Sequence, residues 1–129
     1  MACLETTFLI DLLRGKENVR LLKDKLDETE SSLSITPVSI MELWIGASLK
    51  SSEQEKENIL ALINSLEMLP FNLESAKESA EIYVYLAGQG TIIEISDMMI
   101  AGISKAHGET VVTRDEHFAR ISGLKVLKY

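Results

Sequence analysis

Residues 2–15 read Ala-Cys-Leu-Glu-Thr-Thr-Phe-Leu-Ile-Asp-Leu-Leu-Arg-Gly, and this stretch decides the fold. Its first part, residues 2–6, is a short, mostly apolar run that predicts a strand. Residues 8–13 follow with the apolar character of a short helix, which Gly15 is placed to end. A strand that passes at once into a helix is typical of the α/β class, and it leaves Glu5 at the end of the strand.

The same alternation continues along the rest of the chain. Pro37 suits the first position of a helix after Thr36. Strands separated by helices pair in parallel through right-handed crossovers, so the sequence predicts an open α/β sheet covered by helices on both faces. Further strands are predicted at residues 33–36, 68–71, 110–113 and 124–127, and helices at residues 18–30, 37–49, 52–66, 73–86, 96–107 and, as one or two turns, 115–120.

Composition places the chain among ordinary globular proteins. A length of 129 residues predicts one domain over residues 1–129. Hydrophobic residues make up 46% and charged residues 26%, which are globular averages and exclude a disordered tail or a fibre. The net charge of −7 disfavours a protein that binds nucleic acid through a basic surface alone, because phosphate neutralisation needs clustered Lys and Arg.

The sequence also predicts a cytoplasmic protein with no membrane partner. Cys3 is the only cysteine, which excludes internal disulfides and Cys-rich metal sites. Glu5 and Asp11 interrupt the first apolar stretch, so it does not resemble a signal peptide. The longest unbroken apolar run, residues 98–103, is far too short to span a bilayer.

Four carboxylates recur where a strand ends or a helix begins. Glu5 ends the first predicted strand, Glu42 lies in the first turns of a helix, and Asp97 opens another helix. Asp115 follows the strand predicted at residues 110–113. In an open parallel sheet the strand ends share one edge, and the crevice at that edge is where ligands bind. We therefore expect these four side chains to converge from four separate segments.

A cluster of carboxylates at one edge of a sheet is unfavourable unless a cation binds between them. Like charges a few ångströms apart raise one another's pKa, and removal from water adds to that effect. Mg²⁺ and Mn²⁺ prefer oxygen ligands, and such a cation can activate water and neutralise charge that develops on a phosphate. The chain has no His/Cys set of the zinc type and no glycine-rich phosphate loop. The pattern therefore predicts a Mg²⁺ or Mn²⁺ site.

Three of the four carboxylates also have a purely structural interpretation. Ser39 and Glu42 form a capping-box pattern, in which Glu42 would satisfy backbone N–H groups. Asp97 could be a first-turn acid that faces the helix dipole, and Asp115 could be a helix N-cap. Glu5 has no such alternative, because we expect it at the end of a buried strand rather than at a helix cap.

Five other residues are not assigned to the site. Asp11 interrupts an apolar helix, and a place near the site and an outward position on the helix explain it equally well. His107, at a predicted helix end, and His117, in a short polar turn, have no partner that indicates acid–base chemistry. Cys3 is expected to be a small buried strand residue, and Trp44 to belong to the core or to an interface.

At this point the sequence resembles PIN-domain proteins of the VapC toxin type. Each of four motifs is weak alone, but four in the same order, over essentially the whole chain, are specific. The motifs are Leu4-Glu5-Thr6-Thr7-Phe8-Leu9-Ile10-Asp11-Leu12-Leu13-Arg14-Gly15, Ser39-Ile40-Met41-Glu42-Leu43-Trp44-Ile45-Gly46-Ala47, Asp97-Met98-Met99-Ile100-Ala101-Gly102 followed by His107-Gly108, and Val111-Val112-Thr113-Arg114-Asp115-Glu116-His117-Phe118 with Ile121-Ser122-Gly123-Leu124-Lys125-Val126.

The resemblance implies a three-layer α/β/α sandwich with a mainly parallel central sheet, often homodimeric. It also implies a metal-dependent ribonuclease, usually the toxin of a toxin–antitoxin pair, with RNA as substrate and a VapB-like antitoxin that covers or enters the acidic site. Thr6 and Thr113 would support that site by hydrogen bonds. By matched position, the residues that would hold Mg²⁺ or Mn²⁺ are Glu5, Glu42, Asp97 and Asp115.

Two positions depart from the family pattern. Glu5 stands where the family usually has Asp, and its extra methylene places the carboxylate further out. Ile95 stands two residues before Asp97, where many members carry an acid, and the adjacent Glu94 points elsewhere on a regular backbone. These departures motivate an alternative, a catalytically inert PIN-like module that binds RNA or a partner protein.

The working hypothesis is hydrolysis of RNA phosphodiester bonds, in which no side chain needs to become a covalent nucleophile. A phosphoacceptor domain on a similar sheet ranks lower, because Glu5 is a poor match for the phosphorylated aspartate. Four cations near the motifs are candidates for contact with RNA phosphates: Arg14, Lys16, Lys50 and Arg114. Alternatively, these residues only provide the ordinary charge that keeps a protein surface soluble.

Overall fold

The centre of the structure is a five-stranded sheet in which every neighbouring pair of strands is parallel. A computed structural model of the chain describes residues 1–129. The strand order is β3-β2-β1-β4-β5. The strands are β1 (Ala2–Leu4), β2 (Leu33–Ile35), β3 (Glu67–Met68), β4 (Thr110–Thr113) and β5 (Val126–Lys128).

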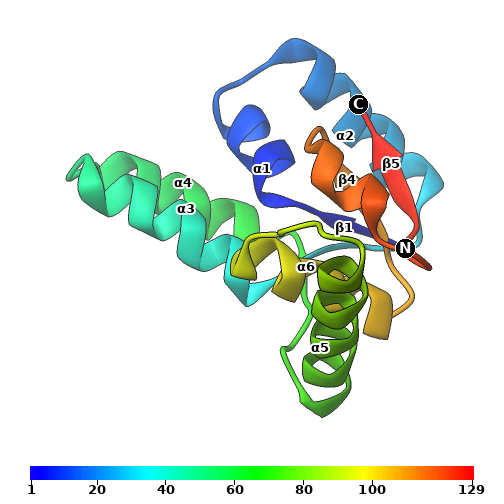
Figure 1. The fold of residues 1–129 in the computed structure, drawn as a ribbon. Coiled ribbons are helices and arrows are strands. Elements are labelled where there is room, and N and C mark those ends of the chain that lie inside the picture. The colour runs from blue at the N-terminus through cyan, green and yellow to red at the C-terminus, as the bar shows by residue number, and fades with distance from the viewer.

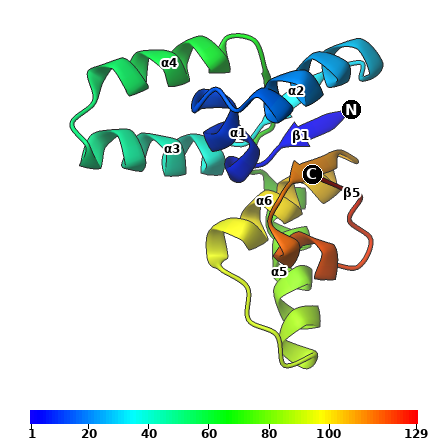
Figure 2. The same ribbon diagram turned by 90° about the horizontal axis from the view of Figure 1, so that it is seen from above.

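Helices cover both faces of this sheet. The first four lie on one side of β1 and the last two on the other, and α3 and α4 form an antiparallel pair that extends beyond the sheet (Figures 1 and 2). No helix is both long enough and apolar enough to cross a membrane. The helices are α1 (Thr6–Leu13), α2 (Glu17–Thr29), α3 (Pro37–Leu49), α4 (Glu53–Ile63), α5 (Leu73–Gly88) and α6 (Ile95–Ala106), with the 3₁₀ helix η1 (Glu116–Arg120).

Two hydrophobic cores lie on opposite faces of the sheet. Leu4 and Val112 belong to the core beneath α1 to α4, whereas Cys3 and Val111 belong to the core beneath α5 and α6. This division follows from the strand geometry, because successive side chains of a strand point to opposite faces. The predicted α/β/α architecture with a parallel sheet is therefore confirmed, and Cys3 is fully buried as expected.

The boundaries of the first and third strands differ from the predicted ones. The first strand ends at Leu4 and α1 begins at Thr6, because the side chain of Glu5 caps the helix by accepting the Thr7 N–H. The strand β3 is short: Leu69 N–H still donates to Ile35 O at 2.9 Å, but β3 itself spans only Glu67–Met68. The strand predicted at residues 68–71 is therefore too long, and the observed strand begins one residue earlier.

Helix α6 is pressed closely against α5 at Gly102. A Cβ at this position would lie 1.9 Å from Ser79 Oγ and 2.9 Å from Ser75 O, so only glycine fits. The close approach fixes α6 over its face of the sheet, with Ile100 and Ile103 fully buried beneath it. The first turn of α6 is thereby held at a defined position, and Asp97 lies in that turn.

The chain order creates a crevice at the carboxyl ends of the strands. From β1 the chain proceeds outward to β2 and β3, and it then crosses to the other side of β1 to form β4 and β5. Such a reversal leaves a gap between β1 and β4 at their carboxyl ends, and ligands bind at such a gap in open α/β sheets. Glu5 follows β1 and Asp115 follows Thr113 of β4, so both stand beside this gap.

Candidate active site

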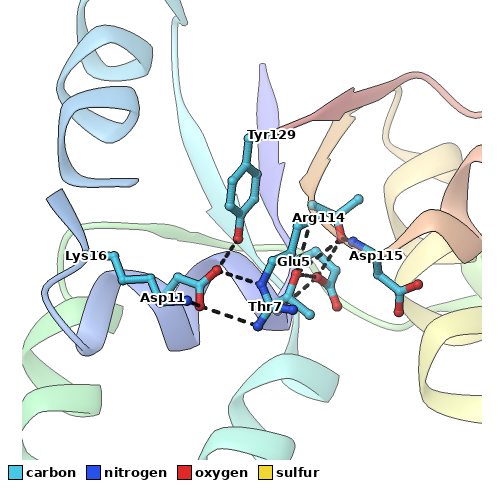
Figure 3. Close-up of polar contacts among 8 residues, drawn as sticks. Glu5, Thr7, Asp11, Lys16, Arg114, Asp115 and Tyr129 are labelled. Carbon is cyan, nitrogen blue, oxygen red and sulfur yellow. Dashed lines mark hydrogen bonds and ion pairs between the residues drawn. The ribbon is translucent and has the colours of Figure 1, made fainter. Parts of the chain in front are cut away.

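Glu5 is buried at the carboxyl end of β1. Its backbone N–H continues the sheet by donating to Val112 O at 3.1 Å. One carboxylate oxygen, Oε2, accepts from Thr7 N–H at 2.8 Å, from the Thr7 hydroxyl, and from the Thr113 hydroxyl at 2.8 Å (Figure 3). The expectation that Glu5 has no capping role is therefore wrong, because the strand ends one residue before it and the helix starts one residue after it.

Burial raises the pKa of Glu5, and the hydrogen bonds from Thr7 and Thr113 oppose that rise by favouring the charged form. Thr113 makes the supporting contact that was expected of it. Thr7 was not predicted, although a hydroxyl residue two positions after an N-cap acid is a local signal for such a contact. Glu5 is thus held in place by three donors on one oxygen.

Glu42 projects from α3 toward α1. Its Oε1 accepts from the Thr6 hydroxyl at 2.7 Å, and Thr6 Oγ1 also lies 2.9 Å from Ser39 Oγ. The capping-box interpretation is wrong, because α3 is capped by Thr36, whose side chain accepts the Ser39 N–H at 3.1 Å. Thr6 therefore supports the site through Glu42, whereas Thr113 supports it through Glu5.

Asp97, Asp115 and His117 form a compact group of side chains. One potential ligand atom from each lies within 4.8 Å of the other two. Asp115 caps η1 by accepting the His117 N–H at 2.9 Å, and its Oδ1 lies 3.1 Å from His117 Nδ1. The expectation that His117 lacks a relevant partner is therefore wrong, because the tight turn after Asp115 folds the imidazole back onto the carboxylate.

The negative charges of the other three predicted carboxylates all act on Asp97. Burial, and then the negative charges of Asp115, Glu5 and Glu42 in that order, raise the pKa of Asp97 to about 7. Asp97 does lie in the first turn of α6, as its structural interpretation required, but the favourable helix dipole does not offset this repulsion. The sheet edge therefore gathers all four carboxylates as the sequence predicted.

The donor set suits a hard divalent cation. No Lys or Arg forms an ion pair with any of the four carboxylates. The available ligand atoms are carboxylate oxygens and one imidazole nitrogen, a set that suits Mg²⁺ or Mn²⁺. The carboxylates repel one another, and a divalent cation bound between them would remove that repulsion. The residues present therefore fit a divalent metal ion.

Two of the predicted RNA-contacting cations form ion pairs with a buried carboxylate. Asp11 is buried rather than outward-facing, and it forms ion pairs with Lys16 at 3.0 Å and with Arg114 at 2.8 Å. The alternative placement of Asp11 on an outward face is therefore wrong. Its partner at position 114 lies 103 residues away along the chain, which sequence spacing alone does not reveal.

The other two predicted cations line a hollow between α1, α3 and α4. Arg14 and Lys50 both border this cavity of about 290 Å³, and Glu42 lines it as well. Lys50 pairs with Glu55 at 3.2 Å, and Arg14 has no ion pair. Both cations thus lie on the side of the site formed by Glu42.

The departure at Ile95 is visible in the structure. Ile95 is the first residue of α6 and is 70% exposed. Glu94 is the exposed N-cap residue of the same helix and makes no side-chain capping hydrogen bond. Neither position adds a carboxylate to the cluster around Asp97, whose four largest causes of a raised pKa do not include Glu94.

Comparisons with known proteins agree with this geometry. A family model described as the PIN domain matches residues 2–124. Ribonuclease VapC1 of Rickettsia felis is 31% identical over 129 residues, which cover 96% of this chain and 92% of that protein. The tRNA(fMet)-specific endonuclease VapC of Salmonella typhimurium is 29% identical over 126 residues, 95% of this chain and 93% of that protein.

Solved structures show the same fold. A chain of the DNA-bound VapBC complex from Salmonella typhimurium matches with a TM-score of 0.89 and 28% identity, covering 99% of this chain and 98% of that chain. A chain of VapBC2 from Rickettsia felis, bound to a DNA fragment from its promoter, matches with a TM-score of 0.92 at 23% identity and with the same coverage. The chain belongs to the PIN domain family.

Proposed function

We propose that this protein is an endoribonuclease of the VapC class that hydrolyses RNA phosphodiester bonds with the help of Mg²⁺ or Mn²⁺. The observation that carries this proposal is the cluster of four carboxylates at the carboxyl ends of β1 and β4, where burial and the charges of the other three raise the pKa of Asp97 to about 7. Relatives named as VapC ribonucleases match over nearly the full chain, which supports the same chemistry.

The metal would be held by Glu5, Glu42, Asp97 and Asp115, with His117 beside them. When bound, a divalent cation supplies an activated water and neutralises charge on the phosphate. Thr6 and Thr113 would hold Glu42 and Glu5 in orientation through the hydrogen bonds described above. Such supporting hydrogen bonds set the direction and basicity of carboxylate ligands.

Cleavage of RNA by the purified protein tests the proposal. Wild-type protein should cleave RNA with Mg²⁺ or Mn²⁺ and stop when EDTA is added, and Asp97→Asn should lose cleavage. Glu94→Gln is the matched control, because Glu94 precedes the same helix but is exposed and is not among the main causes of the raised pKa of Asp97. Cleavage that persists in EDTA, or in Asp97→Asn, would remove the proposed site.

The natural partner is proposed to be a VapB-like antitoxin. Two of the structural neighbours that match this fold are chains of complexes named VapBC. An antitoxin that covers the acidic crevice would inhibit by excluding RNA from the carboxylate cluster. Co-expression with the protein encoded by a neighbouring reading frame should yield a stable complex and abolish cleavage; a neighbour that neither binds nor inhibits contradicts this assignment.

We also propose that the protein is a homodimer, as its family resemblance implies. The α3 helix presents Met41, Ile45 and Leu49 at intervals of four residues, and all three are at least half exposed. An exposed apolar stripe of this kind favours association with another protein surface. Light scattering coupled to gel filtration should give twice the chain mass of 14.3 kDa. A monomer at all concentrations would contradict the dimer.

A catalytically inert PIN-like module is the second candidate function. The specific observation in its favour is Ile95, which leaves no acid at the position where the family often carries one. Glu5 in place of an aspartate points in the same direction. An inert module would neither cleave RNA nor bind Mn²⁺ at millimolar concentration, so metal binding separates the two candidates.

A further inference from the structure

The carboxylate of Asp11 is the most heavily bonded acid outside the proposed metal site. It is 1% exposed. Arg114 Nε donates to Oδ2 at 2.8 Å and Arg114 Nη2 lies 3.4 Å from Oδ1 (Figure 3). Lys16 Nζ lies 3.0 Å from Oδ1, and the Tyr129 hydroxyl donates to Oδ2 at 2.8 Å. Burial alone would raise the pKa of Asp11, but these donors outweigh it and lower the pKa to about 2.

This cluster of Asp11, Lys16, Arg114 and Tyr129, called the Asp11 cluster below, carries a net positive charge. One carboxylate faces two cations, and the side chains of Lys16 and Arg114 are each nearly half exposed. A guanidinium has five N–H donors in a rigid fork. Asp11 engages two of those of Arg114, so three N–H donors are left for another acceptor.

The same guanidinium lies beside the proposed metal site. Arg114 is the residue between Thr113 and Asp115, and its backbone N–H donates to Thr7 Oγ1 at 3.4 Å. Thr7 in turn donates to Glu5. In Figure 3 the Arg114 side chain lies between Asp11 and Glu5. Arg114 nevertheless forms no ion pair with Glu5 or Asp115, because its guanidinium is bound to the carboxylate of Asp11.

We propose that Asp11 is a positioning residue for RNA cleavage and that Arg114 is the phosphate contact it positions. Asp11 holds the guanidinium so that its remaining N–H donors face an RNA backbone phosphate next to the metal site. It also keeps this cation from turning onto the carboxylates and competing with the metal. Planar donors held in a fork suit phosphate oxygens better than a mobile ammonium group does. The role of Asp11 rests on the proposed nuclease function, whereas phosphate binding by Arg114 is testable without it.

RNA binding without cleavage tests the contact made by Arg114. A fluorescein-labelled oligouridylate is titrated with Asp97→Asn protein in EDTA at several salt concentrations. Each phosphate contact to a single strand contributes about 0.7 to the slope of log K against log salt. Adding Arg114→Ala should reduce the slope by about 0.7, whereas Arg20→Ala, an exposed cation on α2, should leave it unchanged. An unchanged slope in Arg114→Ala overturns the proposal.

Cleavage kinetics test the role of Asp11. Under single-turnover conditions, with an oligoribonucleotide that the wild-type protein cleaves, Asp11→Asn should lower the maximal rate at least tenfold. The half-saturating protein concentration should stay equal or fall, because one negative charge is removed. Asp27→Asn is the matched control, since Asp27 also pairs with a lysine but lies exposed on α2. A merely structural role would instead lower activity only in proportion to the folded fraction, with full recovery at low temperature, and that result overturns the proposal.

A failure of the proposed nuclease function and a failure of the proposed role of Asp11 give different results. If wild-type protein cleaves no RNA, the nuclease function fails, and the salt dependence of Arg114→Ala still decides whether Arg114 contacts phosphate. If wild-type protein cleaves RNA and Asp11→Asn cleaves at the same maximal rate, the nuclease function stands and the positioning role of Asp11 is wrong.

Discussion

Ionised Asp97 should destabilise the folded protein, so replacing it with asparagine should stabilise the metal-free chain at high pH. The pKa of Asp97 is raised from 3.8 to about 7 on folding. Below pH 3.8 both the folded and the unfolded state bind the proton. Between about pH 4 and pH 7 only the folded state keeps it, so the free energy of unfolding falls as pH rises and stays low above pH 7.

The size of the effect follows from the pKa difference. From pH 5 to pH 8 the full shift would remove about 3 kcal/mol, at about 1.4 kcal/mol for each pKa unit. Asp97 is only half-buried, and solvent screening reduces the expected change to about 1–2 kcal/mol. The stability of Asp97→Asn relative to wild type should therefore increase by about 1–2 kcal/mol between pH 5 and pH 8.

Urea denaturation in EDTA at the two pH values measures this difference. Added Mn²⁺ should then stabilise wild-type protein by about 2.7 kcal/mol when the free metal is at a hundred times its dissociation constant, and it should stabilise Asp97→Asn less, because that variant binds the metal more weakly. A stability difference between the two proteins that is the same at pH 5 and pH 8 would refute the electrostatic reasoning. Mn²⁺ stabilising both proteins equally would refute the assignment of Asp97 as a ligand.

Two further substitutions test the packing and the support of the site. Gly102→Ala should destabilise the protein by about 2–3 kcal/mol in urea denaturation, because the new Cβ would meet Ser79 Oγ at 1.9 Å. The control Gly46→Ala, a helical position with nothing within 4 Å, should be neutral or stabilising by up to about 1 kcal/mol, and equal losses would contradict the packing argument. Thr113→Val should weaken Mn²⁺ binding at least tenfold in calorimetry by removing a hydrogen bond to Glu5; an unchanged affinity in a folded variant would show that this bond is unimportant.

Much of the fold could be predicted because its signals are local. The proline at position 37 after Thr36 marks the start of α3, and the capping contact of Thr36 confirms it. Alternating strand and helix patterns were sufficient to predict a parallel sheet, and the positions of the four acids at strand ends and helix starts were sufficient to predict that they converge. The ends of short strands were less predictable, because they depend on single backbone hydrogen bonds such as the one from Leu69 N–H to Ile35 O.

The parts of the site that escaped prediction depend on contacts between distant segments or on tight turns. The ion pair of Asp11 joins it to Arg114, 103 residues away along the chain, and sequence spacing does not reveal such a partner. The approach of His117 to Asp115 needs a 3₁₀ turn, which periodicity does not reveal. Glu5 is predicted to be a strand residue, whereas the strand ends at Leu4 and Glu5 caps the helix that follows.

Calorimetric titration with Mn²⁺ tests most directly whether the four carboxylates form one divalent cation site. Wild-type protein and the control Glu94→Gln should bind Mn²⁺ with a dissociation constant below millimolar. Asp97→Asn and Asp115→Asn should each weaken binding at least tenfold, since ligands are lost from the same group of atoms. Absence of binding to wild-type protein at millimolar Mn²⁺, or equal binding by all four proteins, would contradict the metal site and favour the inert module.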